Sequence, residues 1–383
     1  MKRTRREFLQ TSLVTAGAAS VGALLPGAAR AWADEKAPKK LKVLFLGGTR
    51  FLGPHTVRPL MARGHEVTLF NRGKSNPHLF PELEKLVGDR YGDMSALEGR
   101  KWDAVIDTFA YVPRVVRASA ELLKDSVKQY VLISTVSVYA DEGKPDIDES
   151  YPLAKVEPEV VEKIKTHSEV LPYYGALKAL CEQTAEEVMP GRVANIRPGL
   201  IVGPDDPSDR FTYWPVRVSQ GGEVLCPNTP KDYMQIVDVR DLGEWIAMCV
   251  ERNVVGVYNA VQPGGSLTAG RVVQTSKEVS GSDAKFTWVP TEFLEEQKVQ
   301  PWGELPAWIP HKDDYAGFGQ VSSKKAYAKG LKNRELKVTI KDTLDWWKEQ
   351  PEERQKLRAG IKPDREKEVL AAWHAKEKSG GEG

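Results

Sequence analysis

From residue 42 onward, short apolar runs alternate with stretches whose apolar residues recur every three to four positions. The runs predict buried strands, and the longer spacing predicts helices with one buried face. Their alternation predicts βαβ units, and therefore an α/β, Rossmann-type, doubly wound parallel sheet. A helix is expected at 54–63, ended by Gly64. Strands are expected at 42–46, 66–70, 84–87, 104–108, 130–134 and 192–197.

After Gly199 the pattern becomes irregular and rich in Pro and Trp, which indicates a smaller C-terminal substrate-binding lobe. Two aromatic runs, 211–214 and 301–308, could offer ring faces to a sugar or simply pack this lobe. The tail at 376–383 is expected to be disordered. The expected division is a dinucleotide-binding domain at 34–200 and 232–262, a lobe at 201–231 and 263–350, and a C-terminal helical extension and tail at 351–383.

The first 33 residues have the features of an export signal. Thr4-Arg5-Arg6-Glu7-Phe8-Leu9 is a twin-arginine motif, 13–25 is weakly apolar, and Ala31-Trp32-Ala33 is a small-x-small cleavage site. The apolar stretch is shorter than the ~20 residues that span a bilayer, which disfavours a membrane anchor. We therefore expect export by the twin-arginine route to the periplasm or beyond, with no stable anchor after cleavage.

The charge of the mature chain disfavours nucleic acid as a partner. The full chain carries +2, and residues 1–33 contain five basic residues against one acidic residue, so the remainder carries −2. A basic footprint is missing. The three cysteines are expected to be core residues, and neither they nor the six dispersed histidines have metal-ligand spacing, so no metal site is expected.

A glycine-rich run follows the first expected strand, where a pyrophosphate would rest on a helix N-terminus. Its candidate cofactor-binding residues are Gly47, Gly48, Thr49, Arg50, Phe51, Leu52 and Gly53. Gly47 permits a tight turn, and Gly53 permits close helix packing. Arg50 stands where the usual fingerprint has its middle glycine. It could pair with the pyrophosphate, which we favour, or block the site.

The residues after the later strands indicate which dinucleotide is bound. Asn71 and Arg72 follow the second strand, and no acid is present there to bind the adenine ribose, so NADP is favoured over NAD. Alternatively, Arg72 belongs only to a solvated turn. Asp89 could hydrogen-bond the adenine amino group, and Ala110 with Tyr111 would line the nicotinamide side.

Tyr174 and Lys178 form a candidate catalytic pair. Residues four apart share one helix face, so the ammonium could lower the phenol's pKa from its usual value of about 10. That would make Tyr174 a usable acid and base. The spacing alone is weak evidence, because Tyr151 and Lys155 repeat it.

Several runs in order resemble the extended branch of the short-chain dehydrogenase/reductase superfamily, which includes sugar-nucleotide epimerases and dehydratases. They are STVSVY at 134–139, DESYP at 148–152, RPGLIVGP at 197–204, VDVRDL at 237–242 and GVYN at 256–259. The GGxxxxG loop is similar to that of an atypical subgroup described loosely as sugar dehydratases, isoflavone reductases and mRNA-binding proteins.

The resemblance implies roles for three residues. Tyr174 would take a hydroxyl proton as hydride leaves, Lys178 would hold the cofactor ribose, and Thr135 would hydrogen-bond the reacting oxygen. The 39 positions between Thr135 and Tyr174 are more than this branch usually has. The excess predicts an inserted helix at 157–165, either a lid or a solvated surface element.

The leading hypothesis is therefore an exported NAD(P)-dependent epimerase/dehydratase-like oxidoreductase acting on a sugar-like hydroxyl. Because a periplasm maintains no NAD(P)H pool, the cofactor should stay bound, which favours redox-neutral chemistry. The alternatives are a non-catalytic binding protein, including RNA-binding-like relatives, and a simple NADPH-dependent ketone reductase. Helices near 114–124 and 175–187 could form a homodimer contact.

Overall fold

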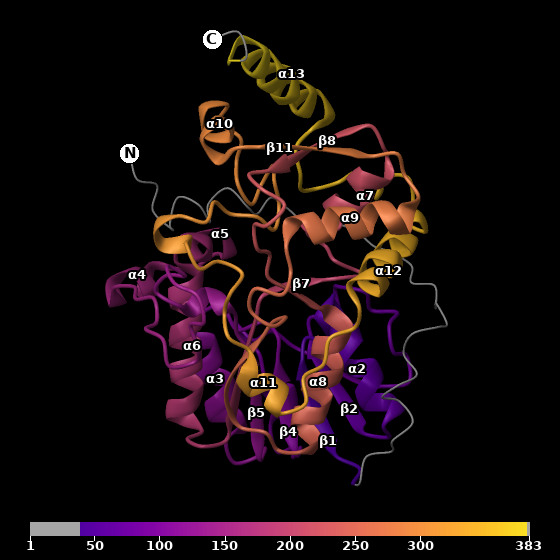
Figure 1. The fold of residues 1–383 in the computed structure, drawn as a ribbon. Helices are drawn as coiled ribbons and strands as arrows, with labels where there is room; N and C mark the ends of the chain where they lie inside the picture. The colour runs from indigo at the N-terminus through magenta and orange to yellow at the C-terminus, as the bar shows by residue number, and fades with distance from the viewer. Residues whose placement is uncertain (1–38, 381–383) are drawn as a thin grey trace.

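The computed structural model describes residues 39–380. The expected export signal and cleavage site at 1–33 therefore lie outside the described residues. Figure 1 shows a lower body that carries the main sheet and an upper lobe formed largely by the later part of the chain.

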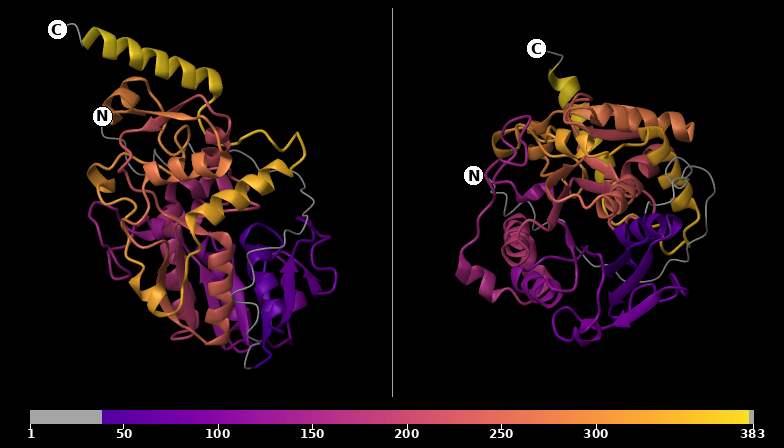
Figure 2. Two further views of the ribbon diagram at one scale, coloured as in Figure 1. Left: turned by 45° about the vertical axis from the view of Figure 1, so that its right-hand side comes forward. Right: turned by 90° about the horizontal axis from the view of Figure 1, so that it is seen from below.

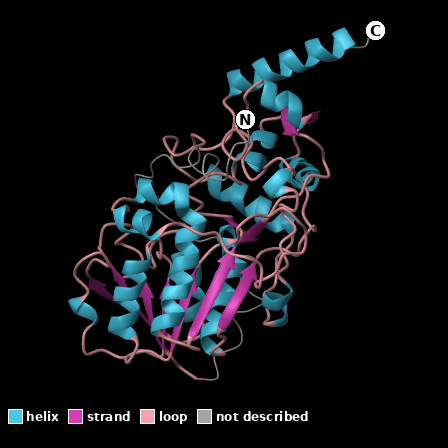
Figure 3. Cartoon of the chain, turned by 90° about the vertical axis from the view of Figure 1, so that its left-hand side faces the viewer, coloured by secondary structure: helices cyan, strands magenta, loops and turns pink. Residues whose placement is uncertain are grey.

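The centre of the molecule is a seven-stranded parallel sheet in the order β10-β6-β5-β4-β1-β2-β3 (Figure 3). The predicted α/β fold class is confirmed. Each expected strand is present to within one residue at either end. The strands are β1 (Lys42–Leu46), β2 (Glu66–Asn71), β3 (Glu84–Val87), β4 (Ala104–Asp107), β5 (Gln129–Ile133), β6 (Val193–Pro198) and β10 (Gly256–Ala260).

Helices cover both faces of the sheet. Successive side chains of β1 alternate between two apolar cores, with Val43 and Phe45 in one and Leu44 and Leu46 in the other. Helices α2 and α8 pack on the first core, and α3 and α6 on the second. These helices are α2 (Leu52–Ala62), α3 (Pro113–Leu123), α6 (Tyr174–Val188) and α8 (Val239–Glu251).

The second lobe has its own apolar core. Both aromatic runs contribute mainly to it, since Phe211, Trp214 and Trp308 are at most 1% exposed. Cys181, Cys226 and Cys249 are buried free thiols, as predicted. The short strand pairs are β7 (Leu200–Val202) with β9 (Ile236–Asp238) and β8 (Glu223–Pro227) with β11 (Lys285–Val289). The later helices are α7 (Tyr213–Ser219), α9 (Ala269–Ser280), α10 (Thr291–Glu296), α11 (Lys324–Ala328) and α12 (Leu336–Lys348).

The C-terminal tail differs from the expectation. Residues up to Gly380 form α13 (Pro363–Gly380), which projects from the lobe in Figure 2, so the prediction of disorder from residue 376 is wrong for this part. Buried Val369 and Leu370 anchor the helix in the lobe core, and Lys376 forms an ion pair with Glu296. Among residues 39–380, no helix is both long enough and apolar enough to cross a membrane.

The predicted insertion forms two short helices, α4 (Pro158–Lys163) and α5 (His167–Val170). No residue of α4 is buried. Ile164 directly follows α4, and Val170 is the last residue of α5. Both pack with Val112 and Leu177 of the main body. The insertion is therefore solvated along α4 and anchored just after it.

Candidate active site

The glycine loop between β1 and α2 has a backbone that only glycine accommodates at several positions. Gly47 and Gly48 have φ values of 116° and 91°. A Cβ on Gly53 would lie 2.5 Å from the carbonyl carbon of Gly48, so α2 could not approach the loop so closely. The result is a cradle of bare backbone at a helix N-terminus, which fits a pyrophosphate.

Two asparagines hold this loop from the β2 side. The Asn71 amide donates to the Gly47 carbonyl at 3.0 Å, and its oxygen accepts the Gly73 N–H at 2.9 Å. The Asn76 amide donates to the Thr49 carbonyl at 2.8 Å. Asn71 thus braces the cradle, and Asn76 is a supporting residue that the sequence analysis missed. Arg72 is exposed just beyond β2.

Arg50, the unusual residue of the loop, has an exposed side chain. Burial raises the pKa of Tyr111, and the positive charge of Arg50 opposes that rise, which places Arg50 near Tyr111. Phe51 is the loop residue that lines the adjoining cavity.

The edge of the sheet beside the loop exposes large apolar side chains. Val87, the last residue of β3, is 67% exposed, and Tyr91 and Phe109, which follow β3 and β4, are 51% and 44% exposed. This edge fits the adenosine half of a dinucleotide. Asp89 lies in the same region, but its carboxylate accepts the Tyr91 N–H at 3.0 Å and so stabilises its own turn.

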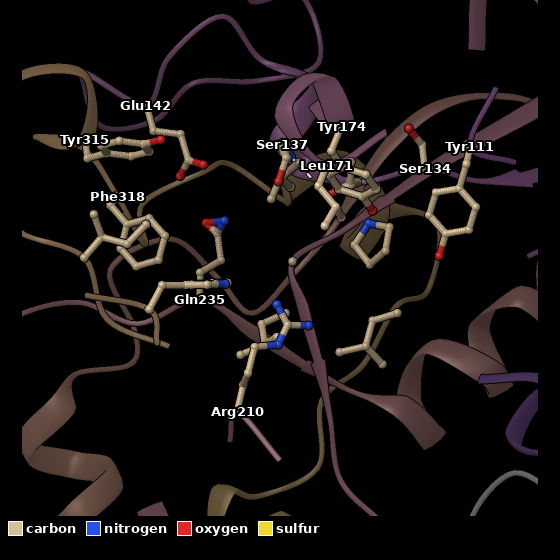
Figure 4. Close-up of a pocket in the computed structure, with 18 of the residues that line it drawn as sticks. Tyr111, Ser134, Ser137, Glu142, Leu171, Tyr174, Arg210, Gln235, Tyr315 and Phe318 are labelled. Atoms are coloured by element: carbon tan, nitrogen blue, oxygen red, sulfur yellow. Dashed lines mark hydrogen bonds between the residues drawn. The ribbon is translucent and has the colours of Figure 1, made fainter. Parts of the chain in front are cut away.

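A cavity of about 310 Å³ lies where the sheet body meets the lobe (Figure 4). Phe51 of the glycine loop, Tyr111 after β4 and Thr135 after β5 line one part of it, together with Tyr174. The lobe, the loop after β5 and the segment before α6 line the rest. The fold therefore brings one end of the candidate cofactor site and two candidate catalytic residues into one space.

Tyr174 begins α6 and lines the cavity together with Thr135, whose hydroxyl acts to lower the pKa of the Tyr174 phenol. A Cβ on Gly175 would lie 1.9 Å from the Ser137 carbonyl oxygen, so this glycine allows α6 to approach the turn that carries Thr135. Thr135 also accepts the Ser137 N–H at 3.1 Å, which fixes that turn. The predicted pair of Thr135 and Tyr174 is brought together.

The expected lowering of the Tyr174 pKa is not found. Burial raises the pKa well above its usual value, the neighbouring Tyr111 adds to the rise, and the Thr135 hydroxyl and the Arg210 charge oppose it. The prediction from the Tyr-to-Lys spacing was therefore wrong on this point. Burial penalises the phenolate more than nearby donors and cations stabilise it, so Tyr174 is a neutral proton donor.

Lys178 lies one turn further along α6 and is 3% exposed. Its ammonium donates to the carbonyls of Ala110 and Ile133, each at 2.6 Å, and lies 5.5 Å from the Tyr111 ring centroid. Lys178 thereby joins the ends of β4 and β5 beside Tyr174. Because an ammonium has three N–H groups, it can still donate to a ribose hydroxyl.

The second pair with the same spacing is separate from this site. Tyr151 donates to Asp141 at 2.8 Å and packs against Tyr139. Neither Tyr151 nor Lys155 lines the cavity.

Residues of the lobe and of the loop after β5 also line the cavity, and no sequence pattern predicted them. Arg210, Glu142 and Gln235 bring a guanidinium, a carboxylate and an amide to the cavity, and Trp302 forms part of its wall. These residues lie in irregular segments without periodicity, so no pattern in the sequence indicated them. Among the described residues, no cluster of His, Cys, Asp or Glu could hold a metal ion.

Comparison with known proteins extends the description of the fold. No family model matches the chain. The structure of WbmH from Bordetella bronchiseptica in complex with NAD+ superposes with a TM-score of 0.59 at 17% identity, covering 81% of this chain and 99% of that one. The structure of the human epimerase family protein SDR39U1 with NADPH superposes with a TM-score of 0.54 at 21% identity. The match covers 79% of this chain and 99% of that one. This chain therefore shares the α/β Rossmann-type fold of these proteins.

Two relatives are similar in sequence. The chloroplast stem-loop binding protein of 41 kDa b from Arabidopsis thaliana is 28% identical over 225 residues, which cover 54% of this chain and 54% of that protein. The epimerase family protein SDR39U1 from Bos taurus is 24% identical over 299 residues, 70% of this chain and 94% of that protein. The match to the chloroplast protein thus spans about half of its length.

Proposed function

We propose that this chain is an exported NAD(P)-dependent oxidoreductase of the epimerase/dehydratase type that acts on a hydroxyl of a sugar-like substrate. The observation that carries the proposal is that Tyr174 and Thr135 line one cavity, which also reaches Phe51 of the glycine loop. Proton-transfer groups and a dinucleotide cradle in one space suit hydride chemistry.

The cofactor assignment is supported by the fit of the site. The bare backbone of Gly47 and Gly48 suits a pyrophosphate, and the solved structures with this fold include complexes with NAD+ and with NADPH. Arg50 and Arg72 are exposed cations beside the cradle, placed to pair with phosphates. Arg72 favours NADP. When bound, the nicotinamide supplies the acceptor and donor of hydride.

The protein's own residues then manage the proton. Tyr174 donates its phenolic proton to the oxygen of a carbonyl that is being reduced, and takes that proton back when the hydroxyl is oxidised. Thr135 hydrogen-bonds the same oxygen, and Lys178 holds the strand ends in place beside it. Because hydride and proton both leave and both return, epimerisation is balanced without an external oxidant.

Replacement of Tyr174 by Phe tests the proposal. Y174F removes the proton carrier and leaves the ring, so turnover should fall by about 10²- to 10⁴-fold while dinucleotide binding is retained. Tyr151→Phe is the matched control and should leave turnover unchanged. Equal turnover in wild type and Y174F would overturn the assignment.

Similarity to the chloroplast stem-loop binding protein supports a second candidate, a binding protein that uses the fold as a scaffold. The net charge of −2 calculated for the chain after residue 33 argues against a nucleic-acid surface. Retention of RNA by the purified mature protein at physiological salt, without dinucleotide, would favour this candidate.

A further inference from the structure

The cavity carries charged and polar groups that the proton transfer does not use. We infer that the substrate is a single hydroxylated ring with an anionic group, bound through that group by Arg210 and through its hydroxyls by Glu142 and Gln235. This inference rests on the proposed function and specifies its substrate class.

The size of the cavity limits the substrate. A volume of about 310 Å³ is at the lower end of the ~300–1,000 Å³ found for ligand pockets. Part of it borders Phe51 and Tyr111 and would be filled by the reactive end of a dinucleotide. Trp302, Ile309 and Phe318 of the lobe also line it. The remaining space suits one ring against aromatic faces, and a nucleotide attached to that ring would have to extend beyond the cavity.

Arg210 supplies the positive charge. Its Nε donates to Ser208 at 3.1 Å, and its guanidinium lies 5.5 Å from the Trp302 ring centroid. The buried carboxylate of Asp206 interacts electrostatically with Arg210, but among the described residues no hydrogen bond or ion pair joins the two side chains, so the outer N–H groups of Arg210 can form a fork for an anion. Figure 4 shows the guanidinium directed into the cavity.

The position of Arg210 also limits where the anionic group can lie. Arg210 and Tyr174 line the same cavity, and the charge of Arg210 opposes the rise in the Tyr174 pKa. An anion bound by Arg210 therefore lies near the reacting carbon, as the carboxylate or phosphate of a monosaccharide does. Burial lowers the pKa of Arg210 and the Asp206 carboxylate opposes that fall, so a bound anion would add to the compensation that Asp206 already provides.

Glu142 and Gln235 line the cavity and are each 5% exposed. The Glu142 N–H donates to the Asp314 carbonyl and its own carbonyl accepts the Gly317 N–H, both at 2.7 Å, so the backbone holds Glu142 firmly. The Gln235 Oε1 is buried and has no hydrogen-bond partner among the described residues. A carboxylate and an amide oxygen both accept, so they match a ligand with hydroxyl donors.

The test is binding to the dinucleotide-loaded protein, measured by titration calorimetry. D-glucuronate, glucose 6-phosphate, glucose and UDP-glucose are compared at one pH and ionic strength. The two anionic monosaccharides should bind about 10- to 100-fold more tightly than glucose, since hydrogen bonds to charged groups are stronger than neutral ones. Which of them binds better identifies the anion as carboxylate or phosphate.

Variants assign the contacts. Arg210→Gln should remove the advantage of the anionic sugars and leave glucose binding within about twofold. Glu142→Gln should weaken all three monosaccharides about 10-fold. Arg271→Gln, an exposed arginine on α9, is the control and should change nothing.

The inference and the proposed function fail in different ways. Tightest binding of UDP-glucose or of glucose, or an anionic advantage that survives Arg210→Gln, would overturn the substrate class while Tyr174-dependent turnover remained. A protein that binds no dinucleotide would instead overturn the proposed function.

Discussion

At the residue scale, the site depends on close approaches that glycine permits and on one buried phenol. Gly53 lets α2 approach the backbone of Gly48, and Gly175 lets α6 approach the backbone of Ser137. A Cβ on either glycine would prevent so close a contact. The first approach shapes the cradle, and the second brings Tyr174 to Thr135. Gly47, Gly53, Thr135, Tyr174 and Lys178 could be predicted from motif and spacing. The direction in which the Tyr174 pKa is shifted could not be predicted, because burial is a property of the packed structure.

The neutral state of Tyr174 predicts opposite pH dependence for the two directions of hydride transfer. Since its pKa lies above its usual value of about 10, the phenol remains protonated at neutral pH. Carbonyl reduction, which uses the phenol, should change little between about pH 6 and 9. Alcohol oxidation, which uses the phenolate, should rise by about one log unit per pH unit over that range. Single-turnover rates of the loaded protein measure both, and a plateau in oxidation near pH 7 would contradict the burial argument.

Gly53→Ala should disrupt the cradle. The added Cβ would meet the Gly48 backbone at 2.5–2.7 Å, so α2 or the loop must shift. We expect destabilisation by about 1–3 kcal/mol and at least about 10-fold weaker dinucleotide binding. Gly99→Ala tests a glycine whose Cβ would meet nothing within 4 Å, although its φ of 70° adds some strain. Calorimetry with NAD and NADP compares dinucleotide binding by the two variants. Undiminished binding to Gly53→Ala would contradict the role of Gly53 in shaping the cradle.

At the element scale, α6 carries the site and connects it to the core. Tyr174, Lys178 and Glu182 follow at intervals of four on one face, and Glu182 pairs with Arg197 of β6 at 2.6 Å. Both side chains of this pair are at most 4% exposed. The strands and α6 could be predicted because their apolar periodicity is strong. The ion pair could not, since it joins residues from elements whose packing the sequence does not specify.

Removal of Glu182 should destabilise the protein strongly. Glu182→Ala leaves Arg197 buried without its carboxylate, so the free energy of unfolding should fall by about 3–5 kcal/mol. Glu187 on the same helix is a matched control, because its 2.6 Å pair with Arg117 is largely exposed, and Glu187→Ala should cost less than about 1 kcal/mol. Urea unfolding measures the loss of unfolding free energy in both variants. Equal losses would show that burial does not determine how much the Glu182–Arg197 pair contributes to stability.

At the scale of the whole molecule, two bodies meet at the cavity and supply different chemistry. The sheet body supplies Thr135 and Tyr174, and the lobe supplies Arg210 and Gln235. The sheet body could be predicted almost completely. The lobe could not, because its short strand pairs and loops follow no period, so its site residues emerge only from the packed structure.

The central claim is that the chain carries a dinucleotide that stays bound. The most direct test is to purify the mature protein from its native compartment, denature it, and identify the released nucleotide by mass spectrometry. We expect close to one NADP or NAD per chain, with NADP favoured by Arg72. A protein that releases none and also fails to bind added NAD or NADP would contradict it and would favour the binding-protein alternative.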